Sequence, residues 1–458
     1  MIETNEDNLT LSNPDQIRDA LTPVEEWATI TPEVRVHPVP AGHAPGAAGF
    51  VLQAEDGSQS HHLLATGDFT TRAVAGYPGL PTDFPVDIDV VFLTAASAPD
   101  STANLTDAIE TVRERAHAGS TVLTTASGLT GVHLGYVLSH LNDQSGRSIP
   151  VTTVGRTATL WESFGYEHPT VETVPEFSDP NEVLDAGQIT VAGPEVPVDG
   201  SAGRLFDRID DDPGATLVQV TSGAFNPETG EHTRGTVYDY QVSNHPTNET
   251  IDEVVGALDP IHVVVAHQRG SSADRYKDKY DSFVWTCEDD DKHTLYDDEW
   301  VGPPWVTEAT RRRIRARQYT NNSSTLKDSL DASEIPLPVV ERSENRDLVA
   351  EGIDVERLTM RQDTTGDGSD SDQRTDIVEP TTEAVSGDQS SDEHSAMDAE
   401  TVLEMNERLA RIEDAIKGRS IQARVIDAGD GITLLRPLED SVGSNRSHGD
   451  VIEITLSE

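Results

Sequence analysis

Short runs of apolar and β-branched residues alternate with longer amphipathic runs from about residue 21 to residue 267. The short runs predict strands at 34–40, 50–54, 61–67, 88–96, 120–127, 187–193, 215–222, 236–243 and 261–267. The longer runs carry apolar residues at helical spacing and predict helices at 102–119, 130–144 and 248–258. Because strands and helices alternate along the chain, the pattern indicates an α/β fold.

The pattern changes after about Arg317. Residues 318–397 hold few aromatic or β-branched clusters and include acidic low-complexity stretches, so they predict a disordered acidic linker. Residues 398–418 predict a short amphipathic helix, and residues 419–458 predict a small all-β module.

The helix at 398–418 carries an apolar stripe at alternating three- and four-residue spacing, formed by Val402, Met405, Leu409, Ile412 and Ile416. Two interpretations fit this stripe. It is either a single helix packed on the neighbouring β module or a short coiled coil that makes the protein a homo-oligomer.

The chain has 82 acidic and 33 basic residues, with a formal net charge of −49. Such acidity along folded-looking segments predicts a protein from the salt-rich cytoplasm of a halophilic archaeon, where screening weakens carboxylate repulsion. An acidic tail that mimics nucleic acid is the rival interpretation. Cys287 is the only cysteine, which excludes an internal disulfide and a cysteine-based zinc knuckle. No signal peptide or membrane span is recognisable, so we expect a cytoplasmic protein without a membrane partner.

One strongly basic run interrupts the acidic sequence, at Arg311, Arg312, Arg313, Arg315 and Arg317. It is the best candidate for contact with nucleic-acid phosphates, although these side chains could instead pair with surrounding carboxylates. Four neighbouring aromatic residues could stack on bases or could cover the edge of a core: Trp285, Tyr296, Trp300 and Trp305.

Three motifs carry candidate metal chemistry. His43 lies in Ala-Gly-His-Ala-Pro-Gly before a strand, and Asp68 lies in Ala-Thr-Gly-Asp-Phe after the next strand. His245 follows Ser-Asn, and His267 ends the apolar run Val-Val-Val-Ala-His. Imidazole and carboxylate groups on tight loops at strand ends are suitable donors for divalent ions.

In their order and surroundings, these motifs resemble the later metal motifs of the β-CASP branch of the metallo-β-lactamase superfamily, which includes RNase J and the mRNA 3′-end processing nucleases. The resemblance covers roughly residues 20–270 and implies zinc. It would make His43 a ligand of one zinc, Asp68 a bridge between two zincs, and His267 a ligand of the second. His245 would be the catalytic proton donor, and a histidine at His267 favours RNA as the substrate.

The resemblance also implies an architecture, namely a partial metallo-β-lactamase αββα sandwich with an inserted β-CASP α/β domain. Residues 1–95 would form the metallo-β-lactamase-like segment, 96–213 the insert, and 214–272 the returning RNA-specificity segment. Residues 273–317 would be an aromatic and Arg-rich extension.

The sequence departs from the family because it contains no His-x-His-x-Asp-His loop, which supplies most zinc ligands, and Thr94 stands where an acidic residue is expected. The missing half would also leave one apolar sheet face uncovered. Either a partner chain covers it, or the true start lies upstream, or the fold has been rebuilt. The leading hypothesis is therefore a β-CASP-like protein of RNA processing with an incomplete zinc site, either part of a split nuclease or non-catalytic. The alternatives are an interaction protein that uses this body and the C-terminal segments for docking, and an active hydrolase with a rearranged site.

Overall fold

The structure is a computed structural model. It describes residues 20–57, 59–145, 148–223, 233–268, 271–277, 279–286, 292–321, 336–358, 423–427 and 433–437. The chain divides into two compact units, Met1–Asp370 and Ser371–Glu458. The first unit contains two large sheets, and the second contains a β-hairpin.

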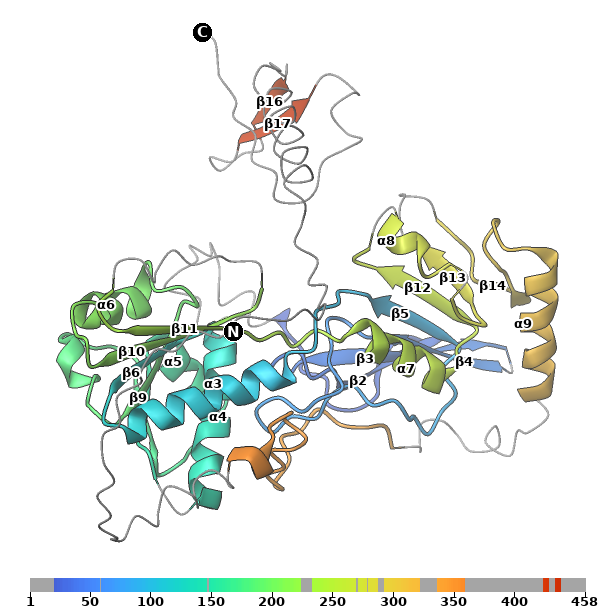
Figure 1. Ribbon diagram of the computed structural model, residues 1–458. Coiled ribbons are helices and arrows are strands. Elements are labelled where there is room, and N and C mark those ends of the chain that lie inside the picture. Colours follow the sequence, from blue (N-terminus) through green and yellow to red (C-terminus); the bar gives the residue numbers. More distant parts are fainter. Residues whose placement is uncertain are drawn as a thin grey trace, which may run out of the picture. The chain divides into compact units, whose positions relative to one another are not determined.

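A seven-stranded mixed sheet has the order β1-β2-β3-β4-β5-β12-β13 (Figure 1). Its strands are β1 (Ala28–Thr31), β2 (Val34–Pro40), β3 (Ala48–Asp56), β4 (Gln59–Ala65), β5 (Val90–Thr94), β12 (His262–Ala266) and β13 (Phe283–Thr286). The first four strands form an antiparallel meander, and β4, β5, β12 and β13 pair in parallel.

A six-stranded sheet with only parallel pairings has the order β11-β10-β6-β9-β7-β8. Its strands are β6 (Thr121–Thr125), β7 (Val151–Val154), β8 (Val171–Val174), β9 (Ile189–Ala192), β10 (Ala215–Thr221) and β11 (Thr236–Gln241). The chain leaves the mixed sheet after β5 and returns to it at β12, which pairs directly with β5. The parallel sheet is therefore an insertion between two neighbouring strands of the mixed sheet.

Helices cover both faces of the parallel sheet, as its buried central strands β6, β7, β9 and β10 require. Apolar side chains of α3 (Thr102–His117) and α4 (Gly128–Ser145) pack in one core with Val122 and Val218, and those of α6 (Gly200–Ile209) pack in another with Leu123 and Leu217. The remaining helical elements are α5 (Arg156–Ser163), η1 (Pro180–Glu182), α7 (Asn248–Leu258), α8 (Ser271–Asp274) and α9 (Glu308–Asn321).

The predicted α/β class is confirmed by these two sheets and their helices. Every strand expected from the apolar runs is present, and the helix predicted at 248–258 has those bounds in α7. Thr247 caps it, since its side chain accepts the backbone N–H of Thr250 at 3.1 Å. The four-residue strands β1, β7, β8 and β13 were not predicted, although β9, which has the same length, lies within the run predicted at 187–193.

The inserted part is longer than expected. The sequence placed its end at residue 213, but β10 pairs with β6 and β11 pairs with β10, so the parallel sheet runs to Gln241. An apolar run does not specify which sheet a strand joins, because that choice depends on long-range pairing.

Part of the predicted linker is folded, which corrects the expectation of disorder for 318–397. Residues 336–358, here called the strap, bury Leu337 in the core of the mixed sheet. The strap buries Leu348, Ile353 and Leu358 in the core of α3 and α4. The four buried apolar side chains are irregularly spaced over these 23 positions, so they make a weak periodic signal although they pack in two cores.

The two faces of the mixed sheet differ. Helix α7 packs on one face, where Ile251, Val254 and Val255 meet the strand core. On the other face, Trp300 of the hairpin β14 (Tyr296–Asp297) and β15 (Glu299–Trp300) packs against Val90 and Val264. A cross-strand row formed by Phe50, Ala65 and Phe92 remains on this second face, with Phe50 42% and Phe92 38% exposed.

The helix predicted at 398–418 and most of the predicted linker lie outside the described residues. Within the predicted β module, β16 (Ala423–Asp427) and β17 (Thr433–Pro437) form an antiparallel pair. Among the helices that the structure describes, none combines the length and apolar character needed to cross a membrane.

Candidate metal centre

Two loops at one end of the mixed sheet carry His43 and Asp68. Gly42 forms an antiparallel bridge with Phe69, and the N–H of Thr70 donates to the carbonyl of Ala41 at 2.9 Å. Gly42 has φ +68°, and a Cβ there would lie 2.7 Å from the carbonyl oxygen of Thr70. Glycine is therefore required at this position, both for the turn and for the close approach of the two loops.

His245 joins the same place from the segment that leads from β11 to α7. The ligand atoms of His43, Asp68 and His245 all lie within 4.8 Å of one another, and each residue is partly buried. The rings of His43 and His245 are 4.8 Å apart between centroids. The structure thus brings together three of the four residues that the motifs singled out.

The surroundings of the two histidines leave nitrogen lone pairs available. His43 Nδ1 lies 3.4 Å from the carbonyl oxygen of Asn244, so that nitrogen donates and Nε2 keeps its lone pair. His245 Nδ1 is buried and has no hydrogen-bond partner. Burial, followed by the neighbouring His43, holds the pKa of His245 below its usual value despite the opposing charge of Asp68. His245 is therefore neutral at neutral pH, as a metal ligand must be.

His267 and Thr94 lie at the ends of two paired strands, β12 and β5. Ala266 pairs with Thr94, and His267 follows in the left-handed region with φ +62°, which is uncommon outside glycine. His267 contributes to the lowered pKa of His245, yet it is not part of the close group of ligand atoms. The group therefore contains the expected proton donor, His245, in place of the expected ligand, His267.

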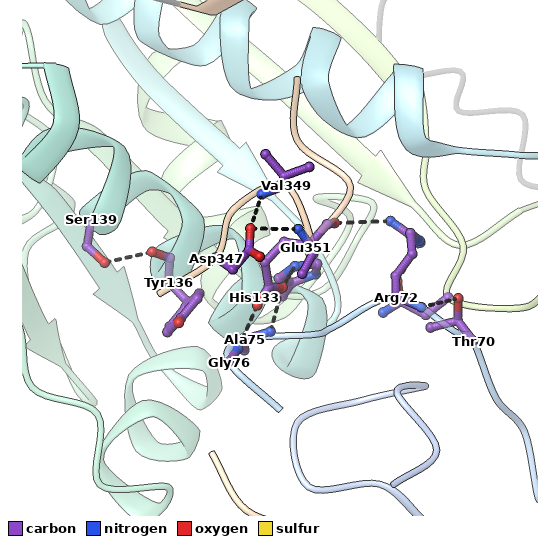
Figure 2. A network of polar contacts seen from close by, with 12 residues as sticks. Thr70, Arg72, Ala75, Gly76, His133, Tyr136, Ser139, Asp347, Val349 and Glu351 are labelled. Atoms are coloured by element: carbon purple, nitrogen blue, oxygen red, sulfur yellow. Dashed lines mark hydrogen bonds and ion pairs between the residues drawn. The ribbon is translucent and has the colours of Figure 1, made fainter. Parts of the chain in front are cut away.

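Arg72 fixes the loop that carries His245. Its guanidinium donates to the carbonyl of Ser243 at 3.1 Å and to Oδ1 of Asn244 at 3.2 Å. It also donates to the carbonyl of Glu351 at 3.4 Å (Figure 2). Ser101 also holds this loop, since its hydroxyl donates to the Ser243 carbonyl at 2.8 Å. The histidine loop is thus held by two side chains, those of Arg72 and Ser101.

The strap closes this network through a buried carboxylate (Figure 2). Glu351 accepts the backbone N–H groups of Ala75 at 2.9 Å and Gly76 at 2.7 Å, and it lies 2.8 Å from Nε2 of His133. The two backbone donors compensate the burial of this carboxylate, and the imidazole of His133 lies beside it. A chain of direct contacts therefore joins α4, the strap and the loop of His245.

The arginines predicted to bind nucleic acid lie on α9, which contributes no residue to the group of His43, Asp68 and His245. Arg312 pairs with Glu308 at 3.3 Å, and Arg313 pairs with Asp281 at 2.8 Å. Arg311 donates to the carbonyl of Pro303 at 3.2 Å, and the side chains of Arg315 and Arg317 lie outside the described part of the chain. Of the four aromatic residues, Trp285 is buried and Trp305 is 43% exposed.

The donor set at the first centre fits a divalent transition metal. Two neutral imidazoles and one carboxylate are typical zinc ligands, and three protein ligands leave a position open in catalytic zinc sites. The buried nitrogen of His245 without a partner is the kind of group that a metal ion would satisfy.

Several residues around the centre were not predicted. Arg72, Ser101 and Glu351 each act through backbone groups that are distant in sequence, so no local motif marks them. A second group of possible ligands, His140, Asp143 and His168, was also missed. Its only local signal is the three-residue spacing of His140 and Asp143 on α4.

No family model and no curated protein matches this chain. A crystal structure of a protein of unknown function from Enterococcus faecalis V583 matches with 14% identity and a TM-score of 0.37. The match covers 54% of this chain and 61% of that one, and a similarity of this size carries no argument about fold or function.

Proposed function

We propose that this chain is a β-CASP-like protein of RNA processing that binds one divalent transition-metal ion with His43, Asp68 and His245. The observation that carries the proposal is the convergence of these three ligand atoms within 4.8 Å. They come from three segments that are far apart in sequence, and each belongs to a motif that resembles the β-CASP family.

The topology supports the same proposal. An α/β insertion interrupts a mixed sheet between β5 and β12, and the candidate centre includes His245, which lies just after β11, the last strand of the parallel sheet. This arrangement is compatible with the expected insertion of a β-CASP domain into a metallo-β-lactamase sandwich.

The centre that we propose is incomplete as a two-metal site. Two-metal hydrolysis needs ions about 3.5–4 Å apart, each with several ligands, and the sequence contains no His-x-His-x-Asp-His loop. The proposal therefore has two forms. In one, a partner chain supplies the remaining ligands of a split nuclease, and in the other the protein is a non-catalytic homologue.

Each residue of the centre has a defined role in this proposal. The carbonyl of Asn244 orients His43, and Arg72 holds Asn244 in place. A zinc ion bound by the three ligands would act as a Lewis acid on a phosphoryl oxygen or on water. The arginines of α9 would meet RNA phosphates, because exposed ion pairs such as Arg312–Glu308 contribute little stability and exchange partners readily.

Metal analysis of the purified full-length chain in molar KCl tests the proposal. We expect Asp68→Asn to lose one zinc equivalent relative to the wild type, and neither protein alone to hydrolyse single-stranded RNA. Asp83→Asn is the matched control, because Asp83 is an exposed carboxylate in the segment between β4 and β5. This variant should keep the full zinc content.

Two results would contradict the proposal. Equal zinc content in the wild type and Asp68→Asn would show that the three residues bind no metal. Loss of two equivalents, together with loss of an RNA-cleaving activity present in the wild type, would instead show a complete bridged centre within this chain.

A further inference from the structure

A second group of histidine and aspartate side chains lies on the parallel-sheet part of the chain. His140 and Asp143 are three residues apart on α4 and therefore share one face of the helix. His168 comes from the connection between α5 and β8. The ligand atoms of these residues lie within 4.8 Å of one another.

The distances in this group match those of a metal site. Oδ2 of Asp143 lies 3.3 Å from Nε2 of His168 and 3.7 Å from Nδ1 of His140. Donor atoms around a tetrahedral zinc ion are separated by about 3.3 Å, given metal–ligand bonds of about 2.0 Å. Two of the three separations between donor atoms are therefore within a few tenths of an ångström of this value, and the third is at most 4.8 Å.

Both histidine side chains are more than nine-tenths buried, with 9% of His140 and 4% of His168 exposed. Nδ1 of His140 has no hydrogen-bond partner. Nδ1 of His168 lies 2.9 Å from the hydroxyl of Thr170 and accepts the backbone N–H of Thr170 at 3.3 Å. These contacts orient the ring so that Nε2 faces Asp143 and donates to its Oδ2 at 3.3 Å, and a metal ion bound at Nε2 would take the place of that proton.

The protonation states also suit a metal ion. Burial first, and then the charges of Arg346 and His168, lower the pKa of His140 to about 4. Burial alone would raise the pKa of Asp143. The hydrogen bond and charge interaction with His168, together with the charge of Arg346, outweigh burial, so the pKa of Asp143 is lowered. At neutral pH His140 is therefore a neutral imidazole and Asp143 is a carboxylate, the forms in which these groups bind metal ions.

A cation from the strap already touches the carboxylate. The guanidinium of Arg346 donates to Oδ2 of Asp143 at 2.9 Å, and its side chain is 55% exposed. An exposed ion pair of this kind contributes little stability, so a metal ion can displace it.

We propose that His140, Asp143 and His168 form a second site for a divalent transition-metal ion such as zinc, for which Arg346 of the strap competes. Two imidazoles and one carboxylate would hold the ion, and water would complete the tetrahedron. Because the group shares no residue with the centre at His43, this inference does not depend on the proposed function.

Titration of the full chain with Co²⁺ tests the site, because tetrahedral Co²⁺ has a strong visible absorption. Asp68→Asn serves as the background, since it removes the carboxylate of the other centre. We expect one Co²⁺ equivalent with tetrahedral bands in this background and none after addition of His168→Gln. Absence of the bands in Asp68→Asn, or their persistence with His168→Gln, would overturn the proposal.

Competition by Arg346 is tested separately. In the same background, Arg346→Gln should tighten Co²⁺ binding by up to about fivefold, the range expected for removing an exposed ion pair. Arg357→Gln is the matched control, because Arg357 is a strap arginine that pairs with Asp107 at 2.7 Å away from the two histidines. Equal affinities in the two variants would contradict the competition.

A crystallographic measurement on the wild type covers the case in which a variant does not fold. Crystals soaked with zinc should show an anomalous peak between His140, Asp143 and His168. A map in which this position has no peak would overturn the site independently of any substitution.

Discussion

Two histidines of this chain, His245 and His262, have lowered pKa values because burial disfavours their charged form. Their surroundings differ in kind. His245 lies beside Asp68 and His43, groups that can share a metal ion. His262 lies fully buried beneath aromatic rings, and its Nδ1 accepts the indole N–H of Trp285 at 2.9 Å. The same electrostatic effect therefore accompanies a candidate ligand in one case and a core residue in the other.

The burial of His262 predicts a pH dependence of stability. Burial lowers its pKa in the folded protein to about 3, against 6.5 in the unfolded chain. Below pH 6.5 the unfolded state thus binds one more proton, and the free energy of unfolding falls as the pH decreases, by about 1.4 kcal/mol per pH unit from this group. The variant His262→Asn tests this, because its amide oxygen can still accept a hydrogen bond from Trp285. Urea unfolding between pH 6.5 and 4.5 should show a smaller decrease in the free energy of unfolding for this variant than for the wild type.

The control for this measurement is His117→Asn, because His117 is exposed at the end of α3. We expect its pH profile to match that of the wild type. If His262→Asn also kept the wild-type slope, the buried histidine would not be the group that titrates on unfolding.

The strap is the element that connects the core of the mixed sheet with the core of α3 and α4. Its Leu337 belongs to the core of the mixed sheet, whereas Leu348 and Ile353 belong to the core of α3 and α4. Polar contacts follow the same path, since Glu351 binds the turn at Ala75 and its carbonyl meets Arg72. The strap therefore acts as a structural tie, and the arginine that it touches also holds the loop of His245.

Substitution within the strap should distinguish this role from that of a linker. Leu348 is 2% exposed, so Leu348→Ala should lower the free energy of unfolding by about 2–5 kcal/mol through lost burial and a cavity. Its neighbour Val349 is 70% exposed, and Val349→Ala should change the free energy of unfolding by no more than about 0.5 kcal/mol. Chemical denaturation at a fixed molar KCl concentration measures both, and equal effects would show that the strap is not packed in solution.

On the scale of the whole molecule, the net charge governs how the stability of the folded state depends on salt. A net charge of −49 produces strong self-repulsion at low ionic strength, and the Debye length shrinks from about 10 Å at 0.1 M salt to about 3 Å at 1 M. The folded state holds these carboxylates closer together than the unfolded chain does. Folding should therefore be weakened by dilution of salt.

We accordingly expect the midpoint of thermal unfolding to rise as KCl is increased from 0.1 to 2 M. The increase should shrink at acidic pH, where protonation removes the carboxylate charge that the salt screens. Scanning calorimetry at pH 7 and pH 4.5 provides the comparison. A salt effect of equal size at both pH values would point to exclusion of salt from the protein surface rather than to screening.

The sequence by itself determined the features that depend on neighbouring residues. Apolar runs predicted nine of the strands, helical spacing predicted α7, and glycine-flanked motifs identified His43 and Asp68. Only the tertiary structure decided which sheet β10 and β11 join, that the strap is buried, and that His245 rather than His267 completes the close group. It also brought His168 to His140 and Asp143. These outcomes rest on pairings between residues far apart in the chain, whose stability depends on the whole packed surface and leaves no periodic signal in the sequence.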